Sequence, residues 1–391
     1  MIYLDHAATT ACAPEAVQAM LPYFTELYGN PSNIYGLSLQ SRKAVNKARA
    51  DVAQAINAAQ SAEITFTAGG TESDNLAILG IARARAETGR HLITTRIEHH
   101  AVLNCFHTLE HEGFKVTYLP VNKEGLVEID SVAQAITKET TLISVMLANN
   151  EIGTVQPLAA ISALTRPRGI CLHTDAVQAA GAMRLDVREL GVDALSISAH
   201  KFYGPKGVGA LYLRQGCNPL PVIFGGGQEK GLRSGTENVP GIVGLARALT
   251  LVGEKGEETR RRLTELRERL IEGVTAKIPG VIVTGSRTER LPGLASFVVK
   301  DIEGESLVIQ LDRRGICASA GAACTSSQSG GSHVLQALGL PGHLTRGNLR
   351  LSIGWENTAE EIEHTIAALA ESVELLRSVS PRRRSKRSDS R

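Results

Sequence analysis

The sequence predicts an α/β protein with a mainly parallel seven-stranded sheet in a large domain and a smaller α+β domain. Between Glu63 and Leu213, short apolar or β-branched runs alternate with stretches whose apolar residues recur at helical spacing. This alternation is typical of an open sheet with helices on both faces, in which ligands bind outside the carboxyl ends of the strands. The expected strands are ITFT, HLITT, KVTYL, TLISVML, CLHT, ALSIS and GALYL.

The chain changes character after Pro240, which predicts where the second domain lies. A long charged helical stretch, GEETRRRLTELRERLIEGVTAK, is followed by VIVTG, ASFVV and a helix expected to begin near Glu303. We therefore expect the smaller domain to start near residue 255.

Composition and charge restrict the class of protein. With 391 residues, 43% hydrophobic and 21% charged, the chain is too apolar for disorder and long enough for two domains. No run approaches the roughly 20 apolar residues of a membrane helix, and Asp5 lies in an N-terminus that lacks the features of a secretory signal. We expect a cytoplasmic protein without a membrane partner.

We expect the cysteines to be free thiols and the basic C-terminus to be disordered. Six cysteines show no CxxC pair or regular framework, so we expect free thiols, one of which is a candidate for reactivity. The end PRRRSKRSDSR has a formal charge of +5. Because the whole chain has +2, the rest of the chain sums to −3. We expect residues 380–391 to be a disordered tail and expect no nucleic-acid partner. His107 and His111 are spaced as on a helix face but lack a third ligand, so no metal site is expected.

The segment ITFTAGGTESDN is a candidate anion site. After a strand, Gly69 and Gly70 would let backbone N–H groups approach a phosphate, and the start of the following helix would add its partial positive charge. Thr71 is expected at the N-cap position, with Asp74 three residues later. By itself, the segment favours the alternative of an ordinary capped turn.

Two further strand ends carry residues suited to a cofactor. Asp175, next to CLHT, could pair with a pyridinium nitrogen and keep it protonated, although it could also simply cap the next helix. Lys201 follows ALSIS, beside Ser198 and His200 and before a glycine-rich turn. A lysine in these surroundings is a candidate for a lowered pKa and for forming a Schiff base.

These segments, taken together and in this order, resemble a known family. AGGTESDN, EHHAVLN, ANNEIGTVQP, HTDAVQAAG, SAHKFYGPKGVGALY and GGGQEKGLRSGTENV resemble the cysteine desulfurases of the NifS/IscS type. These are pyridoxal-phosphate (PLP) enzymes with the type I, aspartate-aminotransferase fold. The resemblance runs from YLDHAATT to LRLSIG near residue 350, and it implies a large domain at 15–255 and a small domain at 1–14 and 256–379.

The resemblance implies a role for each matching residue. Lys201 would carry PLP and move the substrate Cα proton, Asp175 would pair with the pyridine nitrogen, and His99 would stack on the ring and shuttle protons. The phosphate would be held by Thr71, Ser198 and His200, and by Thr236 of a neighbouring subunit, which requires a homodimer. Gln178 would donate to the phenolic oxygen, and Asn150 and Arg350 would hold the substrate carboxylate, for which a guanidinium fork is suited.

Cys324 is the expected nucleophile. It lies in a run of Gly, Ala and Ser residues that predicts a mobile loop, although an isolated cysteine is more often inert. SAGAAC followed by a long loop resembles the nucleophile segment of the NifS/IscS group. The implied reaction converts L-cysteine to alanine and leaves a persulfide on Cys324 for a sulfur-acceptor protein, in iron–sulfur cluster assembly or tRNA thiolation.

Two alternatives remain at this stage. Another PLP lyase or aminotransferase, such as a selenocysteine lyase, would not need Cys324. A non-catalytic scaffold or nucleic-acid-binding protein would not need Lys201, Asp175, Gln178 and Cys324 together, so the sequence disfavours it.

Overall fold

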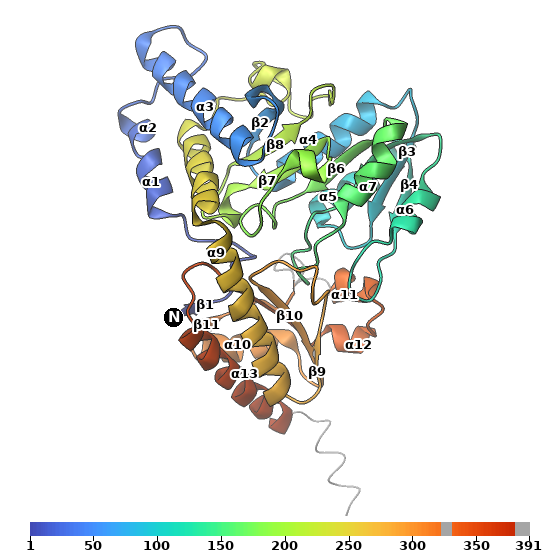
Figure 1. Cartoon of the computed structure of the whole chain (residues 1–391). Helices are drawn as coiled ribbons and strands as arrows, with labels where there is room; N and C mark the ends of the chain where they lie inside the picture. Colours follow the sequence, from blue (N-terminus) through green and yellow to red (C-terminus); the bar gives the residue numbers. More distant parts are fainter. Residues whose placement is uncertain (322–330, 380–391) are drawn as a thin grey trace, which may run out of the picture.

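The seven expected strands form the large sheet of the computed structural model, which describes residues 1–321 and 331–379 (Figure 1). Their order is β2-β8-β7-β6-β5-β3-β4, in which β8 runs antiparallel to both of its neighbours and the other pairs are parallel. All except β4 are buried along their length, as expected for strands covered on both faces. The bounds are β2 Ile64–Thr67, β3 His91–Thr95, β4 Lys115–Leu119, β5 Thr140–Ser144, β6 Cys171–Asp175, β7 Ala194–Ser198 and β8 Gly209–Leu213.

Two hydrophobic cores lie on opposite faces of this sheet. Leu92 and Ile93 are neighbours on β3 but belong to different cores, because successive side chains of a strand point to opposite faces. Leu142 and Ile143 on β5 divide in the same way. The helices before and between the strands are α1 Pro14–Met20, α2 Pro22–Thr25, α3 Gly36–Ala55, α4 Gly70–Ala84, α5 His100–His111, α6 Ile129–Ala135, α7 Leu158–Thr165 and α8 Val187–Leu190.

A smaller unit is built on a second sheet and has its own core. β10 pairs antiparallel with both β9 and β12, while β1 pairs parallel with β11, so the N-terminus joins this unit. Leu4 is accordingly part of the same core as Phe297 and Leu369. The elements are β1 Ile2–Tyr3, β9 Val281–Val283, β10 Leu294–Val299, α10 Gly304–Asp312, β11 Ile316–Cys317, α11 His333–Ala337, α12 Gly342–Thr345, β12 Asn348–Ser352 and α13 Ala359–Val379.

Helix α9 (Val239–Lys277) connects the two units and is kinked at Gly256 (Figure 1). Before the kink Leu249 packs in a core of the large sheet, and after it Leu270 packs in the core of the smaller unit. Gly256 has φ 58° and ψ −154°, a conformation open essentially only to glycine. The glycine therefore sets the change of direction between the units.

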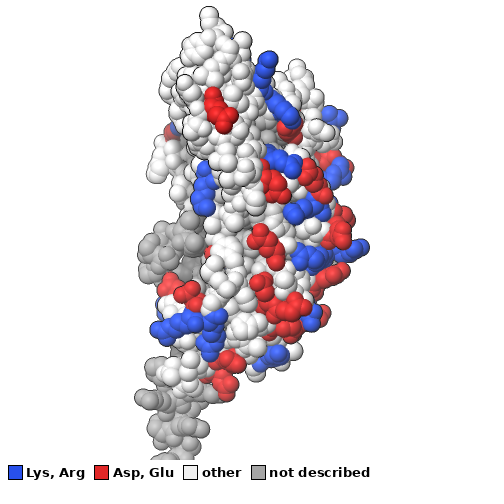
Figure 2. All heavy atoms as spheres, turned by 90° about the vertical axis from the view of Figure 1, so that its left-hand side faces the viewer, with Lys and Arg blue, Asp and Glu red and all other residues white. Residues whose placement is uncertain are grey.

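The face of the molecule drawn in Figure 2 carries charged side chains of both signs. Lysine and arginine are mixed with aspartate and glutamate there. Ion pairs between described residues include Arg269–Glu363 and Arg287–Glu268. Within residues 1–321 and 331–379, no helix is both long and apolar enough to cross a bilayer. Short 3₁₀ helices complete the fold at Ser61–Glu63, Arg166–Arg168, Ala199–Lys201 and Glu229–Gly231.

Candidate active site

A cavity of about 280 Å³ gathers most of the expected site residues beyond the carboxyl ends of β6 and β7. This is the edge at which open parallel sheets bind ligands. Among the described residues, the expected ones that line it are Gly70, Thr71, His99, Asn150, Asp175, Gln178, Ser198, His200, Lys201 and Arg350. Residues more than 270 positions apart in the sequence therefore meet at one place.

Two expected site residues are not placed in this cavity. Thr236 has an exposed side chain on the segment before α9 and does not line it. Cys324 lies outside the described residues.

Lys201 is held by the N-terminal segment of the chain. It ends the short helix Ala199–Lys201 directly after β7, and its Nζ donates to the backbone oxygens of Ala7 at 2.6 Å and Ala8 at 2.7 Å. Gln178 Nε2 also donates to Ala7 O, at 2.9 Å. These carbonyl groups were not expected from the sequence, because every residue carries one and only the fold brings these two to Lys201.

Asp175 is the last residue of β6 and is 6% exposed. Its Oδ1 accepts a hydrogen bond from Val177 N at 2.9 Å, so it stabilises the following turn as well as facing the cavity. Burial raises the pKa of Asp175, and the neighbouring His99 and Lys201 side chains oppose this rise. A cation in the cavity would favour the ionised form further.

His99 is held as a neutral imidazole beside Asp175. It is the N-cap residue of α5, and its Nδ1 accepts a hydrogen bond from Ala101 N at 3.1 Å. Burial lowers the pKa of His99, while the negative charge of Asp175 raises it. The proton of the neutral ring therefore lies on Nε2, which leaves an N–H donor available for chemistry.

The start of α4, where an anion cradle is expected, lies at the cavity, but its cap differs from the expectation. Gly69 is the N-cap and the helix begins at Gly70, so the N-cap position expected for Thr71 is wrong. Glu72 stabilises this end instead, with Oε2 accepting from Ala68 N at 2.9 Å. A Cβ on Gly70 would lie 2.6 Å from Val177 Cγ2, so only glycine lets the helix start approach the turn after β6.

The opposite side of the cradle comes from the turn after β7. His200 Nδ1 lies 3.2 Å from Thr9 Oγ1, and burial lowers the pKa of His200 to about 4. The ring is therefore neutral at pH 7 and can contribute a hydrogen bond to an anion. A wider cavity of about 930 Å³ is lined by Gly70, Thr71, Ser198 and His200 together with Val222 and Ile223.

Arg350, on β12, is oriented by the chain and is 2% exposed. Its Nη1 donates to Asn150 O at 2.9 Å and its Nη2 to Asp5 Oδ1 at 2.8 Å. Its Nε is buried and has no hydrogen-bond partner among the described residues. A guanidinium fixed in this way beside a cavity is suited to an anionic group.

Comparison with known proteins identifies the family. The aminotransferase class-V family model matches residues 2–365. The chain belongs to the class-V aminotransferase family. It is 50% identical over 382 residues to a protein of Clostridium botulinum named cysteine desulfurase IscS, covering 97% of this chain and 96% of that one.

Solved structures of known proteins have a similar fold. A NifS-like protein is similar with a TM-score of 0.90 and 36% identity, covering 96% of this chain and all of that one. A structure described as SspA in complex with cysteine is similar with a TM-score of 0.80 and 36% identity, covering 90% and 99% of the two chains. The resemblance to NifS/IscS-type desulfurases, the type I fold and PLP as the cofactor of this class-V enzyme are thereby confirmed.

The residues present fit PLP on structural grounds. The cofactor needs a lysine for a Schiff base, an acid for the pyridine nitrogen and an anion cradle for its phosphate. Lys201, Asp175 and the Gly70 helix start all line the 280 Å³ cavity, and the missing Cβ at Gly70 keeps the cradle open. No rearrangement of the sheet is required to supply these groups.

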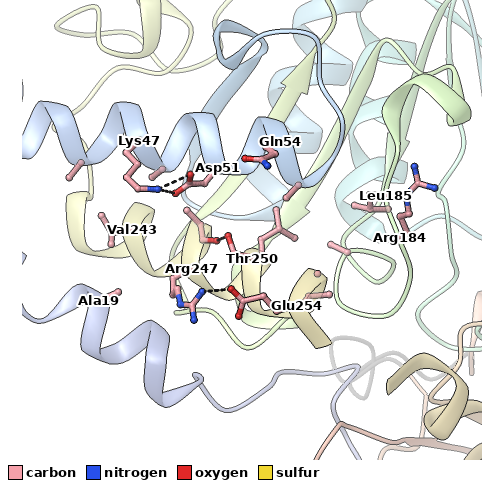
Figure 3. Close-up of a pocket in the computed structure, with 18 of the residues that line it drawn as sticks. Ala19, Lys47, Asp51, Gln54, Arg184, Leu185, Val243, Arg247, Thr250 and Glu254 are labelled. Atoms are coloured by element: carbon pink, nitrogen blue, oxygen red, sulfur yellow. Dashed lines mark hydrogen bonds and ion pairs between the residues drawn. The ribbon is translucent and has the colours of Figure 1, made fainter. Parts of the chain in front are cut away.

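A separate cavity of about 820 Å³ lies between α3 and α9, and none of the expected site residues lines it (Figure 3). Four of its charged side chains are paired with each other, Lys47 with Asp51 and Arg247 with Glu254. The smaller cavity at Lys201, which the expected residues line, is therefore the candidate active site.

Two buried acids near the site were missed by sequence reasoning. Asp74 is 1% exposed and lines the cavity. Glu98, which directly precedes His99 in the sequence, is fully buried. Glu98 accepts hydrogen bonds from Thr95 Oγ1 at 2.7 Å and from Met146 N at 3.0 Å. Burial raises the pKa of both, and that of Glu98 to about 8.

Glu98→Gln is expected to stabilise the protein at alkaline pH. A carboxyl group whose pKa is raised by folding contributes stability below its unfolded pKa, and that contribution is lost as pH rises toward about 8. The difference in unfolding free energy between variant and wild type should grow by up to about 1.4 kcal/mol per pH unit across this range. Chemical denaturation at pH 5 and pH 8.5 checks this, and an equal difference at both values would contradict a protonated Glu98.

Proposed function

We propose that the chain is a cysteine desulfurase. It removes sulfur from L-cysteine, leaves L-alanine, and carries the sulfur as a persulfide on Cys324 to acceptors for iron–sulfur cluster assembly or tRNA thiolation. The observation that carries this proposal is the meeting of Lys201, Asp175, His99 and Arg350 at one cavity. The 50% identity to the IscS protein supports it further.

PLP, when bound to Lys201, withdraws electrons from the substrate Cα and weakens the bonds to it. Asp175 would hold the protonated pyridine nitrogen, and Gly70, Thr71, Ser198 and His200 would hold the phosphate. Gln178, whose Nε2 donates to Ala7 O, would turn its amide to the phenolic oxygen. Lys201 Nζ, when it is not bonded to the cofactor, would take the substrate Cα proton and later return a proton to the product.

The sulfur step uses the cysteine thiol of the chain. The Cys324 thiolate attacks the substrate sulfur, so that an S–S bond forms while the C–S bond breaks and its electron pair stays with carbon. Protons delivered to that fragment complete alanine, and the balance is L-cysteine plus a thiol giving L-alanine plus a persulfide. The His99 Nε2–H group is a proton donor on the cavity wall for this step.

Arg350→Lys is expected to raise KM for L-cysteine about tenfold or more, with a smaller change in kcat. The reason is that a lysine cannot form the bidentate hydrogen bonds that a guanidinium makes with a carboxylate. Steady-state kinetics check this. Arg346→Lys, at an exposed position four residues earlier, is the matched control and should behave as wild type. An unchanged KM in Arg350→Lys would show that the guanidinium does not hold the substrate.

A homodimer would complete the phosphate site through Thr236 of the second subunit. Thr236 is exposed and does not line the candidate active site of its own subunit. The wider cavity, which has Gly70 and Ser198 in common with that site, is open to solvent. Mixing inactive Lys201→Ala and Thr236→Ala subunits should restore activity, because one site of the mixed dimer then has both residues. If the mixture, after subunit exchange, stays inactive, Thr236 acts elsewhere.

We further propose the domain boundaries expected from the sequence, 15–255 for the large domain and 1–14 with 256–379 for the small one. The two separate cores and the Gly256 kink support them. A cytoplasmic location is in keeping with the free thiols of Cys12, Cys105, Cys171, Cys217 and Cys317.

One assay tests the proposed function. The purified holoenzyme is mixed with L-cysteine, with and without dithiothreitol, and sulfide and alanine are measured. We expect equal amounts of alanine and sulfide with the reductant. Without it we expect alanine with almost no sulfide, because the sulfur stays on Cys324 as a persulfide. Turnover of L-selenocysteine alone, with none of L-cysteine, would instead support the selenocysteine lyase.

A further inference from the structure

Tyr203, two residues after Lys201, has an unusual backbone conformation for an aromatic residue. Its φ is +64°, in the left-handed region that side chains with a Cβ rarely adopt. Hydrogen bonds fix this backbone, because Tyr203 N donates to Thr10 Oγ1 and Tyr203 O accepts from Ala13 N, both at 2.8 Å. The strained residue lies immediately beside the turn that projects Lys201.

The ring of Tyr203 is held by Trp355, from the smaller unit. The two rings are stacked with their centroids 3.4 Å apart and their planes at 9°, and Trp355 N donates to the Tyr203 hydroxyl at 3.0 Å. Tyr203 is 7% exposed, and burial raises the pKa of its hydroxyl. The hydroxyl therefore stays protonated and is not an alternative base to Lys201.

Trp355 is in turn attached to α9, the helix that joins the two units. Lys255 Nζ lies 4.5 Å from the centroid of the Trp355 ring, one residue before the Gly256 kink. On the other side of the kink, Arg262 donates to the backbone oxygens of Trp355 and Asn357. A continuous series of contacts thus runs from the kink through Trp355 and Tyr203 to the Lys201 turn.

We propose that Trp355 is a positioning residue for Lys201: it holds Tyr203 in its left-handed conformation and so fixes the turn from which the lysine projects. Lys255 holds the Trp355 ring in place and thereby links the position of Lys201 to the direction of α9. This inference rests on the proposed function only through the role given to Lys201.

The test follows the protein–cofactor linkage without any substrate. In the holoenzyme, the visible absorption of the Lys201 Schiff base is titrated with pH in wild type, Trp355→Leu and Trp355→Phe. We expect the midpoint to move by at least about 0.5 pH units in Trp355→Leu and to return close to wild type in Trp355→Phe, which restores an aromatic ring. A wild-type midpoint in a folded Trp355→Leu protein would overturn the proposal.

Kinetics supply a second readout. Displacing Lys201 from its working geometry should lower kcat about tenfold with little change in KM. Phe297→Leu is the control for lost aromatic packing, because Phe297 lies in the core of the smaller unit and is not part of the Tyr203 contacts. A fall in kcat of equal size in that control would show a merely structural effect.

Lys255→Met keeps the proposal testable if Trp355→Leu does not fold. Lys255 is exposed, so its replacement should leave the core intact, and Lys277→Met on the same helix is the matched control. Trp355 is the chain's only tryptophan, so its fluorescence reports directly on the loss of the cation. A shift of the absorbance midpoint in Lys255→Met but not in Lys277→Met supports the proposal, and no shift in either overturns it. Because cysteine is absent from this titration, its result stands apart from that of the desulfurase assay.

Discussion

Lys201→Ala is expected to lower desulfurase activity by at least about 10³-fold and to remove the borohydride-reducible protein–PLP linkage. Nζ is the only atom of this side chain that can form the Schiff base, and it is also the group that takes the Cα proton. The loss should therefore appear both in the absorbance spectrum and in alanine formation.

Lys138→Ala provides the control for this variant. Lys138 is exposed ahead of β5 and is outside the cavity, so spectrum and rate should be those of wild type. If Lys201→Ala still formed a reducible adduct at a single lysine, the anchor would be a different residue and the assignment of the cavity would be wrong.

Cys324→Ala should separate cofactor binding from sulfur transfer. We expect the spectrum of bound PLP to be retained, while sulfide release from L-cysteine falls by at least about 10²-fold, because no thiolate then accepts the sulfur. The comparison of the two quantities matters more than either alone, since a misfolded protein would lose both.

Cys317→Ser is the matched control for Cys324→Ala. Cys317 is a half-buried free thiol on β11, seven residues earlier in the chain, and no role is expected for it. Full activity of Cys324→Ala with L-cysteine would remove persulfide transfer from the account and favour another PLP lyase.

The fold was predictable where local sequence determines burial. All seven strands of the large sheet coincide with apolar or β-branched runs, because strands covered on both faces are apolar along their length. The run TLISVML was too long as a strand, since β5 ends at Ser144 and the chain then turns toward the cavity. Asp175 and Lys201 were found because they lie at or just after the ends of strands.

The parts of the site that sequence reasoning missed depend on distant contacts. Arg350 and Asp5 are 345 residues apart and form an ion pair only because β1 and β12 lie in the same unit. The Ala7 and Ala8 carbonyl groups have no signature in a sequence. The expected N-cap at Thr71 was wrong because Gly69 and Gly70 let the helix start earlier. With this earlier start, the Asp74 side chain points into the buried interior.

A single-turnover experiment tests the desulfurase account most directly. The holoenzyme is mixed with one equivalent of L-cysteine without reductant, the thiols are then alkylated, and alanine and the Cys324 peptide are measured by mass spectrometry. The account predicts one alanine per active site and one additional sulfur atom on Cys324. Alanine or another keto or amino acid product formed without sulfur on Cys324 would contradict it.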